Sequence, residues 1–494
     1  MKLLKMLFIS IFAGLGILSG CSPEQSQITD WRLAEIPTAE NVGVKALPGE
    51  IAPVKAPFPI IKFEKPDFPP DTTILALSKE GLNTDKIQQA IDVLSEKGGG
   101  TVVLPEGEWF TGRIQLKDNI NLHFSDAAIL KFSGEIGDYL PAVFTRSEGV
   151  EVMSLGACIY ANGATNIAIT GKGRLIGPGK SPVRDQILKG DVVENVIEAT
   201  TPVSERIYDG SAKPYVFSPM MISPVNCSKV YIEGISLENT AFWNIVPIYC
   251  DNVIIRGVTV NSVGIPRGDG IDIESSRNVL IEYCTLSCGD DCFTMKAGRG
   301  DDGLRVNKPT ENVVVRYCLA KQGHGGVTCG SETAGMIRNL YVHDCVFNNT
   351  SVGIRFKTRR PRGGGGENLI YERLRMNLSK EAFAWDMLGS RQFVGELADR
   401  FPARPVNRLT PKYENIHAKD ILVEKARFFV RAKGIPESPL NNVIIENCNV
   451  KCSNSFFIQD MKNSTFRNIK LASRDSLAIF VGTQNLSFKN VSFN

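Results

Sequence analysis

A short apolar strand pattern recurs along most of the chain, and each copy begins with an asparagine. The pattern reads Asn, then in most copies Ile, Val or Leu, then any residue, then in most copies Ile, Val or Phe. Most neighbouring copies are roughly 21 to 34 residues apart. The copies begin at Asn166, Asn252, Asn278, Asn312, Asn339, Asn368, Asn442, Asn463 and Asn485, with variants at Lys229 and Asp420. A second short apolar run lies between copies, so each repeat predicts at least two strands.

Strands this short and this evenly spaced are typical of a solenoid, because one coil cannot bury its apolar face alone. We therefore predict an all-β chain, folded as a right-handed parallel β-helix of about ten coils. A β-sandwich also has many short strands, but it needs no asparagine at a fixed place in every unit. A stacked row of asparagines can satisfy backbone groups at a turn through side-chain hydrogen bonds, which favours the solenoid.

One helix is predicted before the first strands, at residues 83–97. Capping residues open it, apolar residues follow at 87, 90, 91 and 94, and three glycines close it. We expect this short helix to cap the N-terminal end of the solenoid, where an open strand edge would pair with another chain. Two segments interrupt the repeat, 178–218 and 386–415, and we expect both to form the walls of a groove.

The first 21 residues have the pattern of a bacterial export signal. Lys2 and Lys5 precede a mostly apolar run from Met6 to Leu18, which is too short for a comfortable membrane span. Leu18-Ser-Gly-Cys21 then matches a lipobox, in which the cysteine is lipidated and becomes the new N-terminus. The alternative is an ordinary cleaved signal with a chance cysteine. We expect an exported lipoprotein, held at a membrane by its lipid in the periplasm or at the cell surface.

Composition separates the rest of the chain into a spacer and one domain. Residues 22–70 are rich in proline, which suits an extended spacer or a segment draped along the body, and residues 71–494 carry the repeats. The 56 basic and 53 acidic residues nearly balance, so no basic field argues for a nucleic-acid partner.

Twelve cysteines in an exported chain raise the question of disulfides. Without Cys21 their number is odd. Four of them stand six residues after a repeat asparagine: Cys284, Cys318, Cys345 and Cys448. An identical repeat position favours a stacked interior row of free thiols. A bridge between adjacent turns, or one that involves Cys292, stays open.

Polar residues gather on the second strand of four consecutive repeats. The segments are Asp269-Gly-Ile-Asp-Ile, Gly289-Asp-Asp-Cys-Phe-Thr-Met-Lys, Gly323-His-Gly-Gly-Val-Thr and Gly353-Ile-Arg-Phe-Lys-Thr. Stacked coils place equivalent positions about 4.8 Å apart. Because Asp269 and Asp290 are one coil apart, we expect them to face each other. Repulsion among these two and Asp291 should raise one pKa and leave one carboxyl protonated as a general acid.

Each of these residues also has a structural interpretation. Adjacent aspartates often form a turn or a calcium ligand pair, His324 between glycines can be a turn residue, and Arg355 and Lys357 can form a solvated edge. Their order on four successive coils is what favours a site. Carboxylates, an imidazole and two cations on one face are how we expect an enzyme that cleaves an acidic sugar polymer to look.

The motifs resemble those of the polygalacturonase family, glycoside hydrolase family 28. The matching elements are Gly268-Asp-Gly-Ile-Asp, Gly-Asp290-Asp291, Gly-His324-Gly and Arg355-Phe-Lys357, with Gly98-Gly-Gly-Thr-Val-Val-Leu-Pro near the start. The resemblance covers about residues 75 to 494. The segments Gly325-Gly-Val-Thr-Cys-Gly-Ser-Glu and Lys357-Thr-Arg-Arg-Pro-Arg-Gly-Gly look most like the bacterial exo-acting branch.

The resemblance implies hydrolysis with inversion of pectic polysaccharide or oligogalacturonides, without a cofactor or a metal ion. Asp290 would be the general acid, supported by His324, and Asp269 and Asp291 would activate the attacking water. Arg355 and Lys357 would bind the galacturonate carboxylate, for which a planar guanidinium is suited. The catalytic domain would be residues 71–494.

One motif departs from the family. Its first element usually reads Asn-Thr-Asp, whereas Arg267-Gly268 precede Asp269 here. Arg267 adds a cation beside the scissile bond, so we count it among the substrate-binding residues. Arg359, Arg360 and Arg362 either extend this positive edge or are solvated loop charges.

The alternative functions are a rhamnogalacturonan hydrolase of the same family, a pectate lyase or a non-catalytic carbohydrate-binding solenoid. The presence of His324 favours cleavage of a galacturonide bond.

Overall fold

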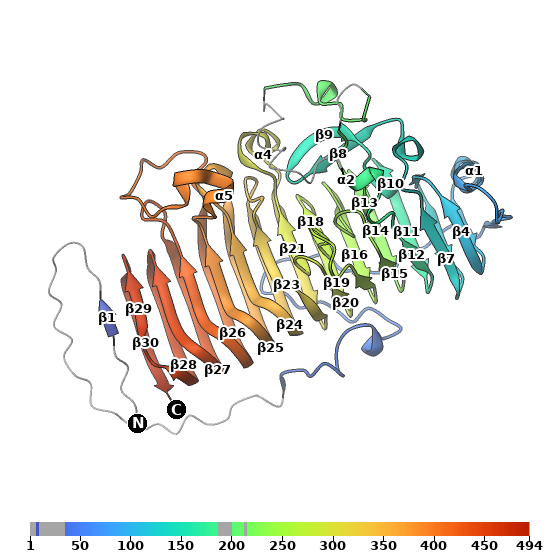
Figure 1. Ribbon diagram of the computed structural model, residues 1–494. Coiled ribbons are helices and arrows are strands. Elements are labelled where there is room, and N and C mark those ends of the chain that lie inside the picture. Colours follow the sequence, from blue (N-terminus) through green and yellow to red (C-terminus); the bar gives the residue numbers. More distant parts are fainter. Residues whose placement is uncertain (1–5, 9–34, 186–199, 212–214, 494) are drawn as a thin grey trace.

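The chain winds into one parallel β-helix, which confirms the predicted fold (Figure 1). The computed structural model describes residues 6–8, 35–185, 200–211 and 215–493. The lipobox cysteine Cys21 and most of the export signal lie outside these residues, so the lipid anchor stays a prediction. No helix in the described ranges is long and apolar enough to cross a membrane.

Three rows of strands run along the solenoid, and each strand pairs in parallel with the equivalent strand of the next coil. The first row holds β2 (Thr72–Ile74), β3 (Gly100–Leu104), β6 (Ile120–Phe124), β11 (Thr165–Gly171), β14 (Ser228–Glu233), β16 (Asp251–Arg256), β19 (Arg277–Glu282) and β22 (Thr310–Arg316). The second holds β4 (Gly107–Thr111), β7 (Ala128–Phe132), β12 (Arg174–Ile176), β15 (Ser236–Glu238), β17 (Thr259–Asn261) and β20 (Thr285–Ser287). The third holds β5 (Ile114–Gln115), β10 (Ala157–Asn162), β13 (Met220–Val225), β18 (Ile271–Glu274) and β21 (Phe293–Lys296).

Later coils join these rows through long bent strands. These are β23 (Leu319–Gly330), β24 (Ile337–Lys357), β25 (Gly365–Asp386), β26 (Lys412–Lys433), β27 (Leu440–Gln459) and β28 (Met461–Asp475), followed by β29 (Ala478–Val481) and β30 (Gln484–Phe493). A three-residue strand, β1 (Met6–Phe8), pairs in parallel with β29 at the C-terminal end. A single core of apolar side chains runs from the first coils to the last.

The repeat asparagines form a ladder at one corner of the coil. All nine have a left-handed backbone, with φ between 51° and 60°, a conformation that asparagine tolerates better than most residues. Their amides bond to one another: Asn339 Nδ2 donates to Asn312 Oδ1 at 2.9 Å, and Asn368 Nδ2 donates to Asn339 Oδ1 at 3.3 Å. The recurrence therefore reflects backbone handedness and amide stacking, rather than the predicted bonding to turn backbone.

The variant copy predicted at Asp420 lies at a different corner of the coil from the nine repeat asparagines. Register pairing aligns Asn368 with Asn415, and Asn442 Nδ2 donates to Asn415 Oδ1 at 2.7 Å. Asp420 belongs to a second ladder, where it accepts a hydrogen bond from Asn447 Nδ2 at 3.0 Å. The pattern did not identify Asn415 because Ala418 stands where the repeat has Ile, Val or Phe.

The predicted helix is α1 (Thr84–Glu96), and it caps the N-terminal end of the solenoid (Figure 1). Its apolar face is buried in the core through Ile87, Ile91 and Leu94. Asn83 accepts the first helical bond through its backbone oxygen, while its side chain bonds to Ser78 instead of to the helix.

The proline-rich segment lies along the body rather than projecting from it. From residue 51 to residue 68 its apolar side chains pack on an outer strip of the first strand row that includes Tyr231, Leu280 and Tyr341. Arg256 and Arg316 hold it further by donating to the backbone oxygens of Pro48 and Ala52. A short turn, η2 (Val44–Ala46), lies within this segment.

All eleven cysteines in the described part of the chain are buried and free. This agrees with the predicted interior row and excludes, for the described residues, the bridges that the sequence left open. Burial raises the pKa of several of these thiols, including that of Cys448, so they act as small apolar groups.

The two insertions differ in what they do. The segment 386–415 carries α5 (Arg391–Val394) and η6 (Gly395–Ala398) and lines the main cavity, as predicted. The described part of 178–218, with α2 (Pro182–Asp185) and η4 (Val203–Glu205), lines no part of it. Instead, Tyr208 and Phe217 support an antiparallel hairpin, β8 (Val143–Ser147) and β9 (Val150–Ser154), which forms the wall. The other short helices are η3 (Ile136–Tyr139), α4 (Gly300–Val306) and η5 (Arg360–Arg362).

Candidate active site

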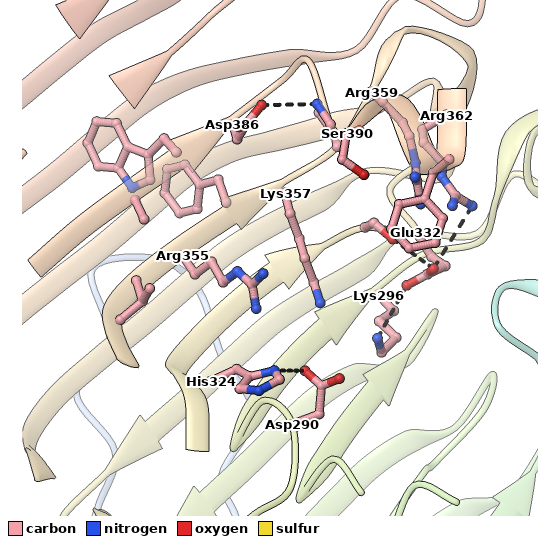
Figure 2. A pocket seen from close by; sticks show the side chains of 18 of the residues that line it. Asp290, Lys296, His324, Glu332, Arg355, Lys357, Arg359, Arg362, Asp386 and Ser390 are labelled. Atoms are coloured by element: carbon pink, nitrogen blue, oxygen red, sulfur yellow. Dashed lines mark hydrogen bonds and ion pairs between the residues drawn. The ribbon is translucent and has the colours of Figure 1, made fainter. Parts of the chain in front are cut away.

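A cavity of about 650 Å³ opens over the third strand row, between the β8–β9 hairpin and the insertion at 386–415. Five of the six polar residues predicted on the four repeats line it, and so does Arg267: the five are Asp269, Asp290, His324, Arg355 and Lys357. Asp291 lies fully buried beneath them. The structure therefore brings the predicted residues together. Figure 2 shows Asp290, His324, Arg355 and Lys357 among them.

The register of the aspartates differs from the expected one. Ile271 pairs with Phe293, so Asp269 stacks on Asp291 rather than on Asp290, and Gly270 N donates to Asp291 O at 2.9 Å. Even so, each of the three carboxylates offers an oxygen within 4.8 Å of the others. The predicted closeness of Asp269 and Asp290 holds, although their pairing across one coil step does not.

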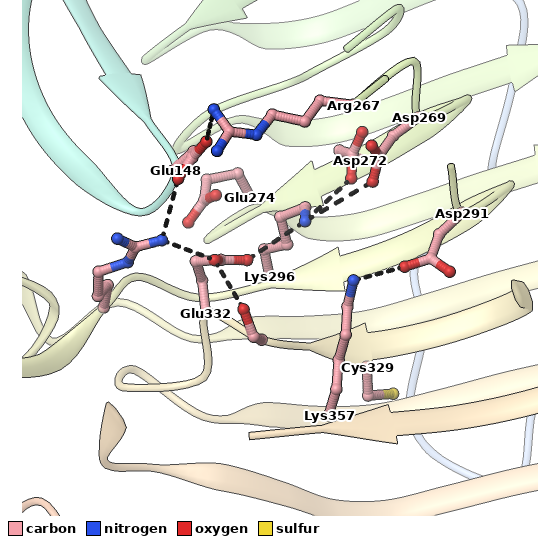
Figure 3. Close-up of polar contacts among 12 residues, drawn as sticks. Glu148, Arg267, Asp269, Asp272, Glu274, Asp291, Lys296, Cys329, Glu332 and Lys357 are labelled. Carbon is pink, nitrogen blue, oxygen red and sulfur yellow. Dashed lines mark hydrogen bonds and ion pairs between the residues drawn. The ribbon is translucent and has the colours of Figure 1, made fainter. Parts of the chain in front are cut away.

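Two cations hold the buried Asp291. Arg355 Nη1 lies 2.8 Å from Asp291 Oδ1. Lys357 Nζ lies 2.7 Å from Asp291 Oδ2, a contact that Figure 3 shows. Burial alone would raise the pKa of Asp291, but the two cations hold it well below its usual value. Between them Phe356 points inward and stacks on Trp385 at 4.8 Å, which fixes its neighbours on the cavity face.

This ion pairing also bears on metal binding. The three aspartates are close enough to hold a cation. Both oxygens of Asp291, however, already face positive charge from the chain itself. Arg355 and Lys357 thus compensate part of the negative charge of the three aspartates.

Asp290 and His324 form a second pair, at the cavity surface. His324 Nδ1 lies 3.0 Å from Asp290 Oδ1, and the Asp290 side chain is 24% exposed (Figure 2). Burial would raise the pKa of Asp290, but the hydrogen bond with His324 keeps it below its usual value. The same bond raises the pKa of His324. The pair therefore holds one proton, which rests on the imidazole.

The raised carboxyl pKa belongs to Asp269. Burial, then the charges of Asp272 and Asp290, raise the pKa of Asp269 well above its usual value. Burial also raises the pKa of Asp272 to about 7, although Lys296 opposes this shift. A carboxyl pKa is raised at Asp269 rather than at Asp290, and burial contributes more to this shift than the expected repulsion does. The pKa of Asp290 stays low because of its hydrogen bond with His324.

Lys296 is the main residue that the sequence analysis missed. It is fully buried, with Nζ at 3.2 Å from Glu332, 3.5 Å from Asp272 and 3.9 Å from Asp269 (Figure 3). Trp243 covers it, with the ring centre 4.2 Å from Nζ. These carboxylates raise the pKa of Lys296 well above its usual value despite its burial, so it is a fixed positive charge under the aspartates. The available signal was its place two residues after Thr294, which aligns with Arg355 through Thr328.

The N-terminal wall of the cavity is an ion-pair cluster. Arg267 Nη1 lies 2.7 Å from Glu148 Oε1 at the tip of the β8–β9 hairpin, and Arg299 Nη2 lies 3.2 Å from the other Glu148 oxygen. Arg299 also contacts Glu332 at 3.3 Å. Arg267 is thus at the cavity, as expected, but it is tied to a hairpin that no motif predicted.

The arginines after Lys357 divide into two roles. Arg359 and Arg362 line the cavity, and the guanidinium of Arg359 lies over the ring of Phe393 in the insertion, 4.6 Å from its centre. Arg360 instead points away and pairs with Glu437 at 2.6 Å. The predicted positive edge therefore consists of Arg359 and Arg362 alone.

Comparisons with known proteins agree with this geometry. The sequence model of glycosyl hydrolases family 28 matches residues 158–386. A probable polygalacturonase of Vitis vinifera is 28% identical over 384 residues, which cover 75% of this chain and 71% of that protein. An exo-poly-alpha-D-galacturonosidase of Dickeya chrysanthemi is 28% identical over 325 residues, which cover 61% of this chain and 54% of that protein.

Among solved structures, a hyperthermoactive exopolygalacturonase from Thermotoga maritima superposes with a TM-score of 0.71 and 27% identity, over 85% of this chain and 94% of that one. A family 28 exopolygalacturonase of Yersinia enterocolitica shares the fold, with a TM-score of 0.67 and 22% identity over 85% of this chain and 78% of that one. The matched residues include the whole span from Asp269 to Lys357. The chain is therefore a glycoside hydrolase and belongs to glycosyl hydrolases family 28.

Proposed function

We propose that this enzyme releases α-linked galacturonic acid from pectic polysaccharide or oligogalacturonides, by exo action and with inversion. The observation that carries the proposal is the contact of Arg355 and Lys357 with Asp291. These cations can bind a uronate carboxylate only beside the aspartate cluster, so recognition of the acidic sugar and cleavage of its bond share one place.

In the proposed reaction Asp290 gives its proton to the glycosidic oxygen while the bond from that oxygen to the anomeric carbon breaks. A water attacks the anomeric carbon from the opposite face and gives a proton to Asp291. Asp291 suits the base because the cations keep it ionised. Asp269, which holds its proton, can donate a hydrogen bond to the water or to the sugar.

Asp290 obtains its proton from His324 across their 3.0 Å hydrogen bond. Bound substrate adds a negative uronate and removes water from the cavity, and both effects raise the pKa of a carboxyl group. The proton then moves from the imidazole to Asp290, which faces the cavity. This step supports Asp290 as the acid although Asp269 has the higher pKa.

Exo action is supported by the two walls of the cavity. The Glu148, Arg267 and Arg299 cluster stands at one end, and Gly389, Ser390 and Phe393 stand at the other. A groove with such walls admits a chain end more easily than the middle of a polymer. The exo-acting relatives from Dickeya chrysanthemi and Thermotoga maritima favour the same mode.

The test is a time course on defined oligogalacturonides and rhamnogalacturonan fragments, with product size and anomeric form followed by NMR. We expect a single short galacturonide product from the first minutes, formed initially as the β-anomer. Early products of mixed length would refute exo action, and an initial α-anomer would refute inversion. Faster cleavage of the rhamnogalacturonan fragments would assign the alternative substrate. Unsaturated products that vanish with a chelator would indicate a lyase instead.

We also propose that the enzyme is tethered by a lipid on Cys21, from the lipobox sequence alone. The protein expressed in a bacterial host should partition into detergent and fractionate with membranes. Cys21→Ser should leave it in the aqueous phase, and Cys158→Ser serves as the control. Detergent partition of Cys21→Ser equal to that of the parent protein would refute the anchor.

A further inference from the structure

A second pair of cations repeats the Arg-x-Lys spacing of Arg355 and Lys357 further along the cavity. β24 pairs with β25, and β25 pairs with β26, in an unbroken register at this end of the strands. Through Ala384, Arg355 aligns with Arg431, and through Asp386, Lys357 aligns with Lys433. Both new cations line the same cavity as the first pair.

The coils on either side of these two do not repeat the pair of cations. On the preceding coil the aligned positions are Thr328 and Gly330, and on the following coil they are Phe457 and Gln459. The coil between the pairs offers a small Ala384 and an acidic Asp386. The face thus reads cationic, then acidic, then cationic along the axis of the solenoid.

The second pair is held far more loosely than the first. Arg431 Nη1 lies 3.5 Å from Glu381, and Lys433 Nζ lies 3.6 Å from Asp386. Their side chains are 47% and 26% exposed. Contacts of this length are weak in water, so a ligand carboxylate can replace them with little loss.

We propose that Arg431 and Lys433 form a second carboxylate subsite, which binds another uronate of the same substrate chain. This inference rests on the proposed function, since the first uronate is the one at Arg355 and Lys357. Two strand spacings separate the pairs, about 9 to 10 Å, which one sugar ring cannot bridge. Asp386 between them repels a carboxylate and accepts hydroxyl hydrogen bonds. The site is therefore built for an acidic oligosaccharide that carries carboxylates on non-adjacent sugars.

Such a pattern occurs in oligogalacturonides and in oligomers that alternate galacturonate with rhamnose. The test compares kcat/KM on an aryl galacturonide, which has one carboxylate, with kcat/KM on tri- and tetragalacturonate and on the alternating oligomers. Arg431→Gln and Lys433→Met should each lower the ratio of long-substrate to aryl-substrate kcat/KM by about tenfold, through KM. The controls Arg427→Gln and Lys425→Met change exposed residues of the same strand that do not line the cavity.

The outcomes separate this subsite from the reaction itself. If the parent enzyme cleaves none of the galacturonides, the proposed function fails and the subsite fails with it. If the parent cleaves them and the ratio is unchanged in both variants, only the subsite is refuted. An equal loss on the aryl substrate would assign a structural role to the pair and would also refute it. The alternating oligomers then show which polymer supplies the second carboxylate.

Discussion

Arg355 Nη1 lies 2.8 Å from Asp291 Oδ1, so a cation for the substrate and a carboxylate for the reaction are bonded to each other. A uronate that binds Arg355 competes with Asp291 for the same charge. As Asp291 loses part of its cationic support, its pKa rises and it becomes a stronger base. Substrate binding itself would thereby prepare the group that accepts the proton from water.

Replacing Arg355 by alanine should weaken uronate recognition and shift the pH profile. We expect KM for digalacturonate to rise about 10- to 100-fold, since a charge-assisted bond is lost. Arg355 lowers the pKa of Asp291, so its removal raises that pKa and moves the acidic limb of kcat/KM to higher pH. Arg338→Gln, a change at a partly exposed residue of the same strand that does not line the cavity, is the control. An equal loss on a neutral-sugar substrate would contradict the role in uronate binding.

The choice of general acid is tested by a leaving group that needs no proton. Asp290→Asn should reduce turnover of digalacturonate by about 10²- to 10⁴-fold while it retains oligogalacturonide binding. On 4-nitrophenyl galacturonide the loss should be much smaller, because nitrophenolate leaves unprotonated. Asp291→Asn should lose activity on both substrates. If Asp269→Asn, and not Asp290→Asn, keeps its activity on the aryl substrate, the general acid is Asp269. Near-parent activity of Asp290→Asn on digalacturonate would exclude Asp290 as the acid.

The fold was predictable because its signal is local and repeated. A left-handed corner that favours asparagine, followed by β-branched residues, recurs in nearly every coil. Asn415 was lost only because Ala418 broke the apolar pattern. The β8–β9 hairpin was missed for a different reason: its residues alternate like any strand, and no sequence pattern shows that it folds over a cavity more than 100 residues further along the chain.

The site was predictable in membership but not in electrostatics. Motifs on consecutive coils had to meet on one face, as Asp269, His324 and Arg355 do. The register failed because the coil step here is that from Ile271 to Phe293, one residue longer than the step counted between the aspartates. Lys296 was overlooked because its importance comes from complete burial among carboxylates, which depends on the packing of distant coils.

The alkaline limb of activity should depend on His324. Its pKa is raised by Asp290, so the pair keeps its shared proton up to a pH above that of an ordinary histidine. In His324→Asn the only proton left in the pair belongs to Asp290 itself, so the alkaline limb of kcat/KM should move to lower pH. His417→Asn, on the opposite side of the coil, should leave the profile in place. An unshifted limb in His324→Asn would show that this pair does not supply the catalytic proton.

Asp272 should make stability depend on pH. It is fully buried, and within the described residues neither of its carboxylate oxygens has a hydrogen-bond partner. Burial raises its pKa to about 7 from 3.8. A raised carboxyl pKa means that stability is fully present below the unfolded value and is lost as the pH rises toward 7, by up to about 4 kcal/mol.

Asp272→Asn cannot ionise, so its free energy of unfolding in urea, relative to the parent, should increase between pH 4.5 and pH 8. The exposed change Asp126→Asn should leave the difference in unfolding free energy independent of pH. If the difference for Asp272→Asn is also independent of pH, Asp272 is already ionised at pH 4.5, and the effect of Lys296 on its pKa outweighs that of burial.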